Sequence, residues 1–231
     1  LSKKPIPKSV PREISLRYHY SAMQVFRYLL DLLFPPRESE QLVRGASADT
    51  LAVLVSPSVI LFEEITITAL LPYRAPLIQA AITEAKYHRN ETAQNLLGKV
   101  LAEYVLELSS EEAALSGSIV LLPIPLSKER HKERGYNQVE QVCAVAAHHV
   151  PTLKVDSTLL SRIRDTVPQT TLARTARLQN MQGAFFAQNI NPSYTYVVVD
   201  DVTTTGATLQ AAVSALRSAG ALHLIPLALA H

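Results

Sequence analysis

Residues 197–209 decide the fold class and run Val-Val-Val-Asp-Asp-Val-Thr-Thr-Thr-Gly-Ala-Thr-Leu. The valines predict a buried strand that ends in two carboxylates, Asp200 and Asp201. A loop of small residues follows, and a helix is predicted over 208–218. In an open α/β sheet, ligands bind beyond the carboxyl ends of the strands. The stretch therefore predicts a ligand site at the turn from strand to helix.

The composition of this loop favours a phosphate group. Gly206 allows close approach of the backbone, and the N–H groups and dipole of a helix N-terminus attract anions. Hydroxyl donors come from Thr203, Thr204, Thr205 and Thr208. The two carboxylates would repel that phosphate unless they accept hydrogen bonds from sugar hydroxyls, with a divalent cation sharing the charge. A ribose 5-phosphate satisfies both halves of the stretch.

A purely structural explanation exists for each part of this stretch. Paired aspartates after a strand are often helix caps or surface residues, and runs of threonine are common in strands. Asp200 and Asp201 alone favour that explanation, whereas the whole strand–loop–helix string favours the phosphate site. No Gly-Lys-Ser/Thr follows, so the loop is not a Walker loop.

The C-terminal half alternates short apolar runs with helical segments, which predicts a parallel sheet with helical crossovers. The expected strands are 119–122, a weaker 154–160, 196–199 and 223–230, and the expected helices are 138–149 and 208–218.

The N-terminal half has a less regular pattern. A helix is predicted over 15–33 and ends at Pro35-Pro36, followed by a polar, linker-like break over 37–50. Residues 51–73 predict strands, and helices are expected from Pro76 to Ala85 and over 93–108.

Composition excludes several classes of protein. The chain has 231 residues, 48% hydrophobic and 18% charged, with a net charge of +2, which excludes a disordered chain and predicts no general affinity for nucleic acid. A single cysteine, Cys143, excludes an intramolecular disulfide and a cysteine zinc site. The apolar stretch 51–62 is too short for a bilayer, and the N-terminus lacks the pattern of a signal peptide. We expect a cytoplasmic protein with no membrane partner.

Residues 197–209 resemble the phosphoribosyl pyrophosphate (PRPP) loop of type I phosphoribosyltransferases. Three further segments, 73–90, 121–142 and 162–185, resemble the ComF family of phosphoribosyltransferase-like proteins. The likeness covers about residues 70–231, in the order of the family. It implies an α/β domain over 71–231 with a type I phosphoribosyltransferase-like parallel sheet flanked by helices. Residues 1–70 remain as a small N-terminal α+β appendage without assignment.

The resemblance assigns roles to individual residues. Asp200 and Asp201 would hold the ribose hydroxyls of PRPP as catalytic residues, together with Lys128 and Arg174. The residues expected to bind PRPP are Asp200, Asp201, Thr203, Thr204, Thr205, Gly206, Ala207 and Thr208. The pyrophosphate loop would use Ser127, Lys128 and Arg134, and a mobile loop over 162–177 would use Arg164 and Gln169. Lys86 and Tyr87 resemble a Lys-Tyr position of the family.

The basic residues over 128–134 have a structural alternative. Their charges alternate in sign in Lys-Glu-Arg-His-Lys-Glu-Arg, which is also typical of a solvated helix face. The arginines of 162–177 equally suit a helix surface or an interface.

The function implied by the resemblance is transfer of phosphoribosyl from PRPP to an unknown nitrogen acceptor, with release of pyrophosphate. Mg²⁺ would arrive with PRPP and have no direct protein ligand. Purine-salvage relatives carry an aspartate at the position of Thr204, and a threonine cannot act as an acid or base near neutral pH, which disfavours purine acceptors. ComF-like proteins often have a cysteine zinc module after Phe-Pro-Pro, whereas Glu38-Ser39-Glu40 follow here, so no zinc is expected.

A second hypothesis belongs to another class: a non-catalytic protein of the PRPP fold that senses a nucleotide or assists DNA uptake in competence. The basic N-terminal arm, with Lys3, Lys4, Lys8 and Arg12, suits weak contact with nucleic acid, although a solvated tail explains it as well. The oligomeric state stays open, with a homodimer as one option.

Overall fold

The computed structural model describes residues 31, 34–62, 65–111, 118–164 and 181–231. Its helices are α2 (Glu38–Arg44), α3 (Ala48–Ala52), α4 (Pro76–Tyr87), α5 (Glu91–Glu111), α6 (Lys128–Arg134), α7 (Gln138–His149) and α9 (Ala207–Ser218). Its strands are β1 (Ser58–Phe62), β2 (Ile65–Leu71), β3 (Ile119–Pro123), β4 (Lys154–Val155), β5 (Leu160–Arg162), β6 (Phe185–Ala187), β7 (Thr195–Val202) and β8 (His223–Ala230). No described helix is long and apolar enough to cross a bilayer.

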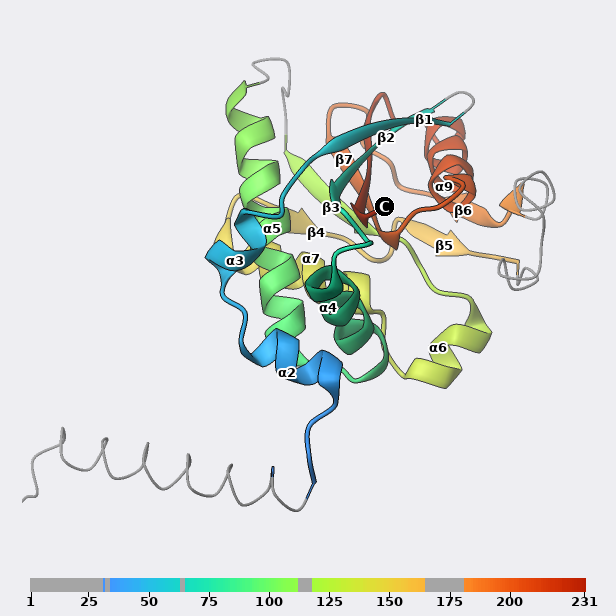
Figure 1. Cartoon of the computed structure of the whole chain (residues 1–231). Helices are drawn as coiled ribbons and strands as arrows, with labels where there is room; N and C mark the ends of the chain where they lie inside the picture. The colour runs from blue at the N-terminus through green and yellow to red at the C-terminus, as the bar shows by residue number, and fades with distance from the viewer. Residues whose placement is uncertain (1–30, 32–33, 63–64, 112–117, 165–180) are drawn as a thin grey trace, which may run out of the picture.

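Six strands form one sheet in the order β1-β2-β8-β7-β3-β4 (Figure 1). β1 pairs antiparallel with β2, and every other neighbouring pair is parallel. β7 lies between β3 and β8, with Val198 opposite Leu122 on one side and Pro226 on the other. The prediction of an α/β fold with a parallel, phosphoribosyltransferase-like sheet is confirmed.

Helices cover both faces of the sheet, so β7 is buried on both sides. Side chains alternate along a strand, and Val197 and Val199 therefore pack with α4, α5 and α7, whereas Tyr196 and Val198 pack with α9 and the small antiparallel sheet β5–β6. A continuous apolar run is what a strand buried on both faces requires.

Three sequence predictions differ from the structure. Residues 37–50 are not a linker, because α2 and most of α3 lie there and Val43 is fully buried. The single weak strand expected over 154–160 is instead β4 at the sheet edge and β5 in the separate two-stranded sheet. Residues 128–134 form the helix α6, with the hydroxyl of Ser127 as its N-cap and Gly135 as its left-handed C-cap.

The expected appendage and domain share one sheet. β1 and β2 lie mostly before residue 71, and β2 pairs parallel with β8 through Thr68 opposite Leu227. The division at residue 70 stays a prediction of organisation, but the sheet hydrogen bonds cross it. The predicted helix over 15–33 and the basic N-terminal arm lie outside the described residues, apart from Asp31.

Candidate functional site

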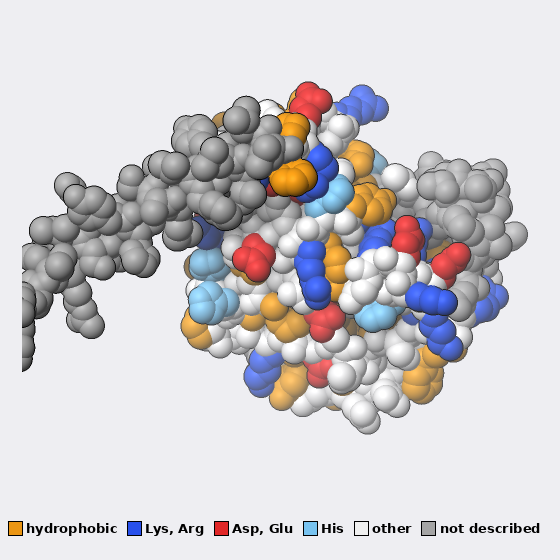
Figure 2. Space-filling view, turned by 90° about the horizontal axis from the view of Figure 1, so that it is seen from below, with side chains coloured by type: hydrophobic (Ala, Val, Ile, Leu, Met, Phe, Trp, Pro, Cys, Tyr) orange, Lys and Arg blue, Asp and Glu red, His pale blue; other side chains and the backbone are white. Residues whose placement is uncertain are grey.

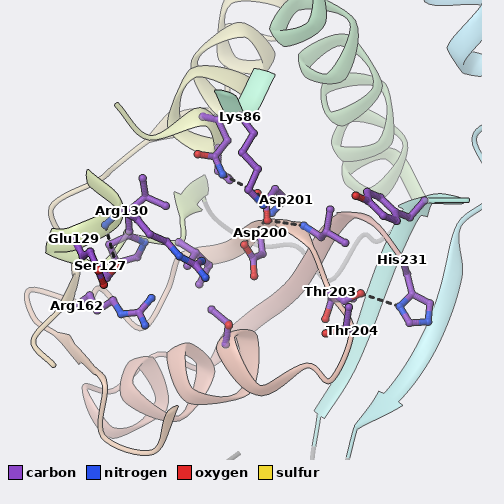
Figure 3. A pocket seen from close by; sticks show the side chains of 18 of the residues that line it. Lys86, Ser127, Glu129, Arg130, Arg162, Asp200, Asp201, Thr203, Thr204 and His231 are labelled. Atoms are coloured by element: carbon purple, nitrogen blue, oxygen red, sulfur yellow. Dashed lines mark hydrogen bonds and ion pairs between the residues drawn. The ribbon is translucent and has the colours of Figure 1, made fainter. Parts of the chain in front are cut away.

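A cavity of about 870 Å³ opens at the carboxyl ends of the parallel strands (Figure 3). The segment after β7 contributes Asp200, Asp201, Val202, Thr203, Thr204 and Thr208. The segments after β2, β3 and β8 contribute, among others, Tyr73, Arg74, Ser127, Glu129, Arg130 and His231. The predicted position of the ligand site, at the strand–helix turn of residues 197–209, therefore coincides with a cavity.

Asp201 lies on the face of the sheet that α4 and α7 cover, and it carries an ion pair. Lys86 Nζ lies 3.0 Å from Asp201 Oδ2, and Gln138 Nε2 donates a 2.7 Å hydrogen bond to the same oxygen. The backbone N–H of Val202 donates to Oδ1 at 2.7 Å. Burial alone would raise the pKa of Asp201, but Lys86 and these donors hold the pKa below its ordinary value. Asp201 is thus a fixed anion.

Asp200 has the opposite electrostatic character. The backbone N–H of Asp201 donates a 2.9 Å hydrogen bond to Asp200 Oδ1. Burial and the charge of Asp201 raise the pKa of Asp200 to about 7. Two adjacent carboxylates with pKa values pushed apart are a pattern of functional sites. Asp200 is the carboxylate left able to bind a ligand.

The predicted phosphate loop turns from β7 into α9, and three of its residues do not line the cavity. Gly206 is left-handed (φ 68°) and caps α9, which begins at Ala207. The first-turn N–H groups of a helix have no intrahelical acceptor and favour an anion. Thr203, Thr204 and Thr208 line the cavity, whereas Thr205, Gly206 and Ala207 are buried and are not among its lining residues.

The segment predicted to form the pyrophosphate loop lines the cavity with a different cation from the two predicted ones. Ser127 and Arg130 line the cavity, but Lys128 and Arg134 are not among its lining residues. Because residues 128–134 are helical rather than a loop, successive side chains point in different directions. Arg134 instead donates to Gln138 Oε1 at 3.0 Å and lies over the ring of Tyr87.

The predicted mobile loop falls largely on undescribed residues. Gln169 and Arg174 lie outside the described residues. Arg164 donates to the carbonyl of Gln182 at 2.6 Å and is not among the lining residues. Arg162, two residues earlier on β5, lines the cavity, and Figure 3 places it on the same side as Ser127 and Arg130.

Residues 135–138 connect the separate parts of the site. The hydroxyl of Tyr136 donates to the carbonyl of Ala85 and accepts from the N–H of Arg89 at 2.9 Å, which holds the turn after Lys86. Asn137 donates to the carbonyl of Ile124 at 2.9 Å and caps α7. Gln138 reaches Asp201. These contacts involve residues distant in sequence, so spacing alone did not reveal them.

Lys86 is also held from the N-terminal side. Glu84 lies on α4, two residues before Lys86, and its side chain is fully buried. The guanidinium of Arg37 donates two hydrogen bonds to its carboxylate, at 3.1 and 2.9 Å. Ser39 and Asn90 donate to the same carboxylate at 2.7 and 3.1 Å. These hydrogen bonds, which we call the Glu84 brace, hold α4, the helix that carries Lys86, against the start of α2.

This brace predicts a loss of stability in acid. Burial opposes the charge of Glu84, but Arg37, Ser39 and Asn90 outweigh it and lower its pKa to about 2. A lowered carboxyl pKa stabilises the fold above the unfolded pKa of about 4.3, and the contribution disappears as pH falls toward 2. We expect Glu84→Gln to lower the free energy of unfolding at pH 7 by about 3 kcal/mol and to flatten its pH dependence between pH 5 and 2.

Urea denaturation at several pH values measures this effect. Glu91→Gln, at the exposed start of α5, is the matched control and should retain the acid dependence of the wild type. An unchanged pH profile in Glu84→Gln would contradict the role given to the brace.

Curated relatives of this chain are named for competence and DNA utilisation. DNA utilization protein YhgH of Salmonella typhi is 32% identical over 135 residues, which is 58% of each chain. Competence protein F of Haemophilus influenzae is 32% identical over 105 residues, 43% of this chain and 44% of that protein. Competence protein ComFC of Bacillus subtilis is 33% identical over 103 residues, 44% of this chain and 39% of that protein. These relatives support an assignment of the chain to the ComF family.

The ComF assignment rests on part of each sequence. The matches span less than two thirds of the relatives' own length, and no protein-family model matches the chain. Together with the parallel sheet, the assignment agrees with the resemblance found in residues 73–90, 121–142, 162–185 and 197–209. The relatives are named for competence and DNA utilisation, and their names do not state the chemistry of the cavity, which follows from its residues.

Proposed function

We propose that this ComF-family protein binds PRPP in the cavity and transfers its phosphoribosyl group to a nitrogen acceptor, with release of pyrophosphate. One observation carries the proposal: a single cavity combines a helix N-terminus, two carboxylates of unequal pKa, and cations. An anion-binding turn suits the 5-phosphate, carboxylates suit sugar hydroxyls, and cations suit pyrophosphate. PRPP carries all three groups in one molecule.

Each part of PRPP would contact the cavity residues that follow a different strand of the sheet. The N-terminus of α9, with Thr204 and Thr208, would bind the 5-phosphate. Asp200, with Asp201 fixed behind it, would accept from the ribose hydroxyls. Arg130 and Arg162 would stabilise the charge that develops as pyrophosphate leaves. Catalysis would then rest on orientation and charge stabilisation, without a covalent enzyme nucleophile.

The carboxylates of the cavity suit a Mg²⁺ ion that enters with PRPP. No group of three or more metal-binding side chains occurs among the described residues, and two adjacent carboxylates are too few to fill the shell of the ion. Oxygens of the ligand would have to complete it. Bound there, Mg²⁺ would neutralise charge on the pyrophosphate.

A second function has support in the relatives. A protein related to competence and DNA utilization proteins could bind PRPP or a nucleotide as a signal, or assist DNA uptake, without transferring phosphoribosyl. On the face shown in Figure 2, lysines and arginines are interspersed with acidic side chains. Such a mixed surface gives less of the phosphate affinity that nucleic-acid binding needs than a broad basic patch would. This face therefore gives little support to DNA binding, whereas the groups that line the cavity support the transfer of phosphoribosyl.

Calorimetric titration with PRPP tests the proposal. We expect binding that strengthens with Mg²⁺ and that weakens about 100-fold or more in Asp200→Asn/Asp201→Asn, because the carboxylate that accepts from the ribose hydroxyls and the fixed anion behind it are both lost. Asp49→Asn, on the exposed part of α3, should bind as the wild type does. Unchanged affinity in the double variant would remove PRPP from this cavity, and PRPP binding without pyrophosphate release would favour the sensor.

A further inference from the structure

β7 divides the cavity into two chemically different sides. Because β3 and β8 flank β7 in the sheet, Ser127 and Arg130 lie on one side and His231 on the other. Figure 3 shows this separation, with Asp200 and Thr203 between Arg130 and His231. The β3 side carries Arg130 and Arg162 with Glu129, whereas the β8 side carries the imidazole of His231 with Tyr73 and Arg74 from the segment after β2.

His231 is held in one orientation by three hydrogen bonds. Its backbone N–H donates to the carbonyl of Leu71 at 3.1 Å, and its carbonyl accepts from the N–H of Tyr73 at 2.9 Å. Its ring Nδ1 lies 2.9 Å from the carbonyl oxygen of Thr203. The backbone contacts join His231 to the end of β2, and the ring contact places the imidazole beside Thr203, at the start of the phosphate loop.

The contact with Thr203 determines the tautomer. A carbonyl oxygen can only accept a hydrogen bond, so Nδ1 must carry the proton. In the neutral ring Nε2 then has a free lone pair. Among the described residues, Nε2 has no partner. The cavity thus contains an oriented base, a role that Thr204 cannot fill.

The chemistry of displacement selects the side from which an acceptor arrives. A nucleophile forms its bond to C1 of the ribose on the face opposite the departing group. If pyrophosphate leaves toward Arg130 on the β3 side, the acceptor approaches from the β8 side, where His231 lies.

We propose that Nε2 of His231 accepts the proton of the nitrogen nucleophile during phosphoribosyl transfer. The nitrogen lone pair forms the N–C1 bond, and the C1–O bond breaks with its electron pair leaving on pyrophosphate. The N–H proton passes to Nε2 and then to solvent. The acceptor is accordingly an amine or ring nitrogen that carries a proton. This inference rests on the proposed function.

Three measurements, on the wild type and on His231→Asn, test the inference. The asparagine amide can replace Nδ1 as the donor to Thr203 but has no basic nitrogen, and His223→Asn, at the exposed start of β8, is the matched control. Calorimetry measures affinity for PRPP with Mg²⁺. Pyrophosphate release is followed with water and with ammonia as probe nucleophiles. ¹⁵N NMR of the wild type identifies the tautomer of His231.

We expect PRPP affinity within twofold of the wild type in both variants. Pyrophosphate release should fall about 10²–10⁴-fold in His231→Asn alone. The pH–rate profiles of the wild type and His231→Asn should differ, because only the wild type carries the imidazole. The other ionisable groups that line the cavity near His231 are Tyr73, Arg74, Asp200 and Asp201. NMR should show the proton on Nδ1.

The other outcomes distinguish failure of the inference about His231 from failure of the proposed function. Equal pyrophosphate release in His231→Asn and the wild type would exclude the base and leave the PRPP site intact. Bound PRPP without release to either nucleophile, or a proton on Nε2 instead of Nδ1, would exclude it as well. Absence of PRPP binding in the wild type would instead refute the proposed function itself.

Discussion

Replacing Gly206 with alanine is expected to lower the free energy of unfolding by about 3–5 kcal/mol and to abolish PRPP binding. The residue has φ 68°, which costs an L side chain about 1–2 kcal/mol. An added Cβ would also lie 2.6 Å from Phe62 Cγ and 3.0 Å from Ile67 Cδ1. Both neighbours are buried, so the ring cannot move aside without opening the core.

Gly135→Ala separates the two causes of this effect. Gly135 has φ 75°, but nothing lies within 4 Å of its added Cβ. Gly135→Ala should therefore lower the free energy of unfolding only by the cost of the left-handed backbone, about 1–2 kcal/mol. Urea denaturation of both variants measures the difference. Equal losses would mean that Phe62 does not constrain the phosphate loop.

Replacing Lys86 with methionine is expected to lower the free energy of unfolding by about 3 kcal/mol at pH 8. The side chains of Lys86 and Asp201 are only 20% and 12% exposed, so methionine leaves a nearly buried carboxylate with Gln138 as its remaining side-chain donor. The pKa of Asp201 should rise, because the cation that lowers it is gone. Since a protonated Asp201 needs no cation, the loss should be smaller at pH 5 than at pH 8.

A double-mutant cycle tests the pairing directly. Lys86→Met/Asp201→Asn should recover much of the stability lost in Lys86→Met, because no unpaired charge remains. Lys132→Met, on the exposed surface of α6, should cost less than about 0.5 kcal/mol. Additive losses in the double variant would show that Lys86 stabilises the fold through its packing rather than through Asp201.

The position of the site followed from local sequence, whereas the supports around it did not. Asp200 and Asp201, Gly206 and the start of α9 lie within one short stretch, and strand ends and helix starts leave strong local signals. Lys86 could also be singled out from the sequence, because Lys86 and Tyr87 resemble a Lys-Tyr position of the ComF family. Nothing local linked it to Asp201, more than a hundred residues away in the chain, or indicated that Arg130 and not Lys128 lines the cavity.

By itself the sequence determined the alternation of strands and helices, the α/β class and the strand–helix turn that can hold a phosphate, because each depends on the periodicity of apolar residues and on small residues at turns. Only the tertiary structure decided that Lys86 and Gln138 meet at Asp201, that Glu84 is braced by Arg37, and that His231 turns its ring toward Thr203. These contacts depend on the order and register of strands in the sheet, which arise from long-range packing and leave no fixed spacing in the chain.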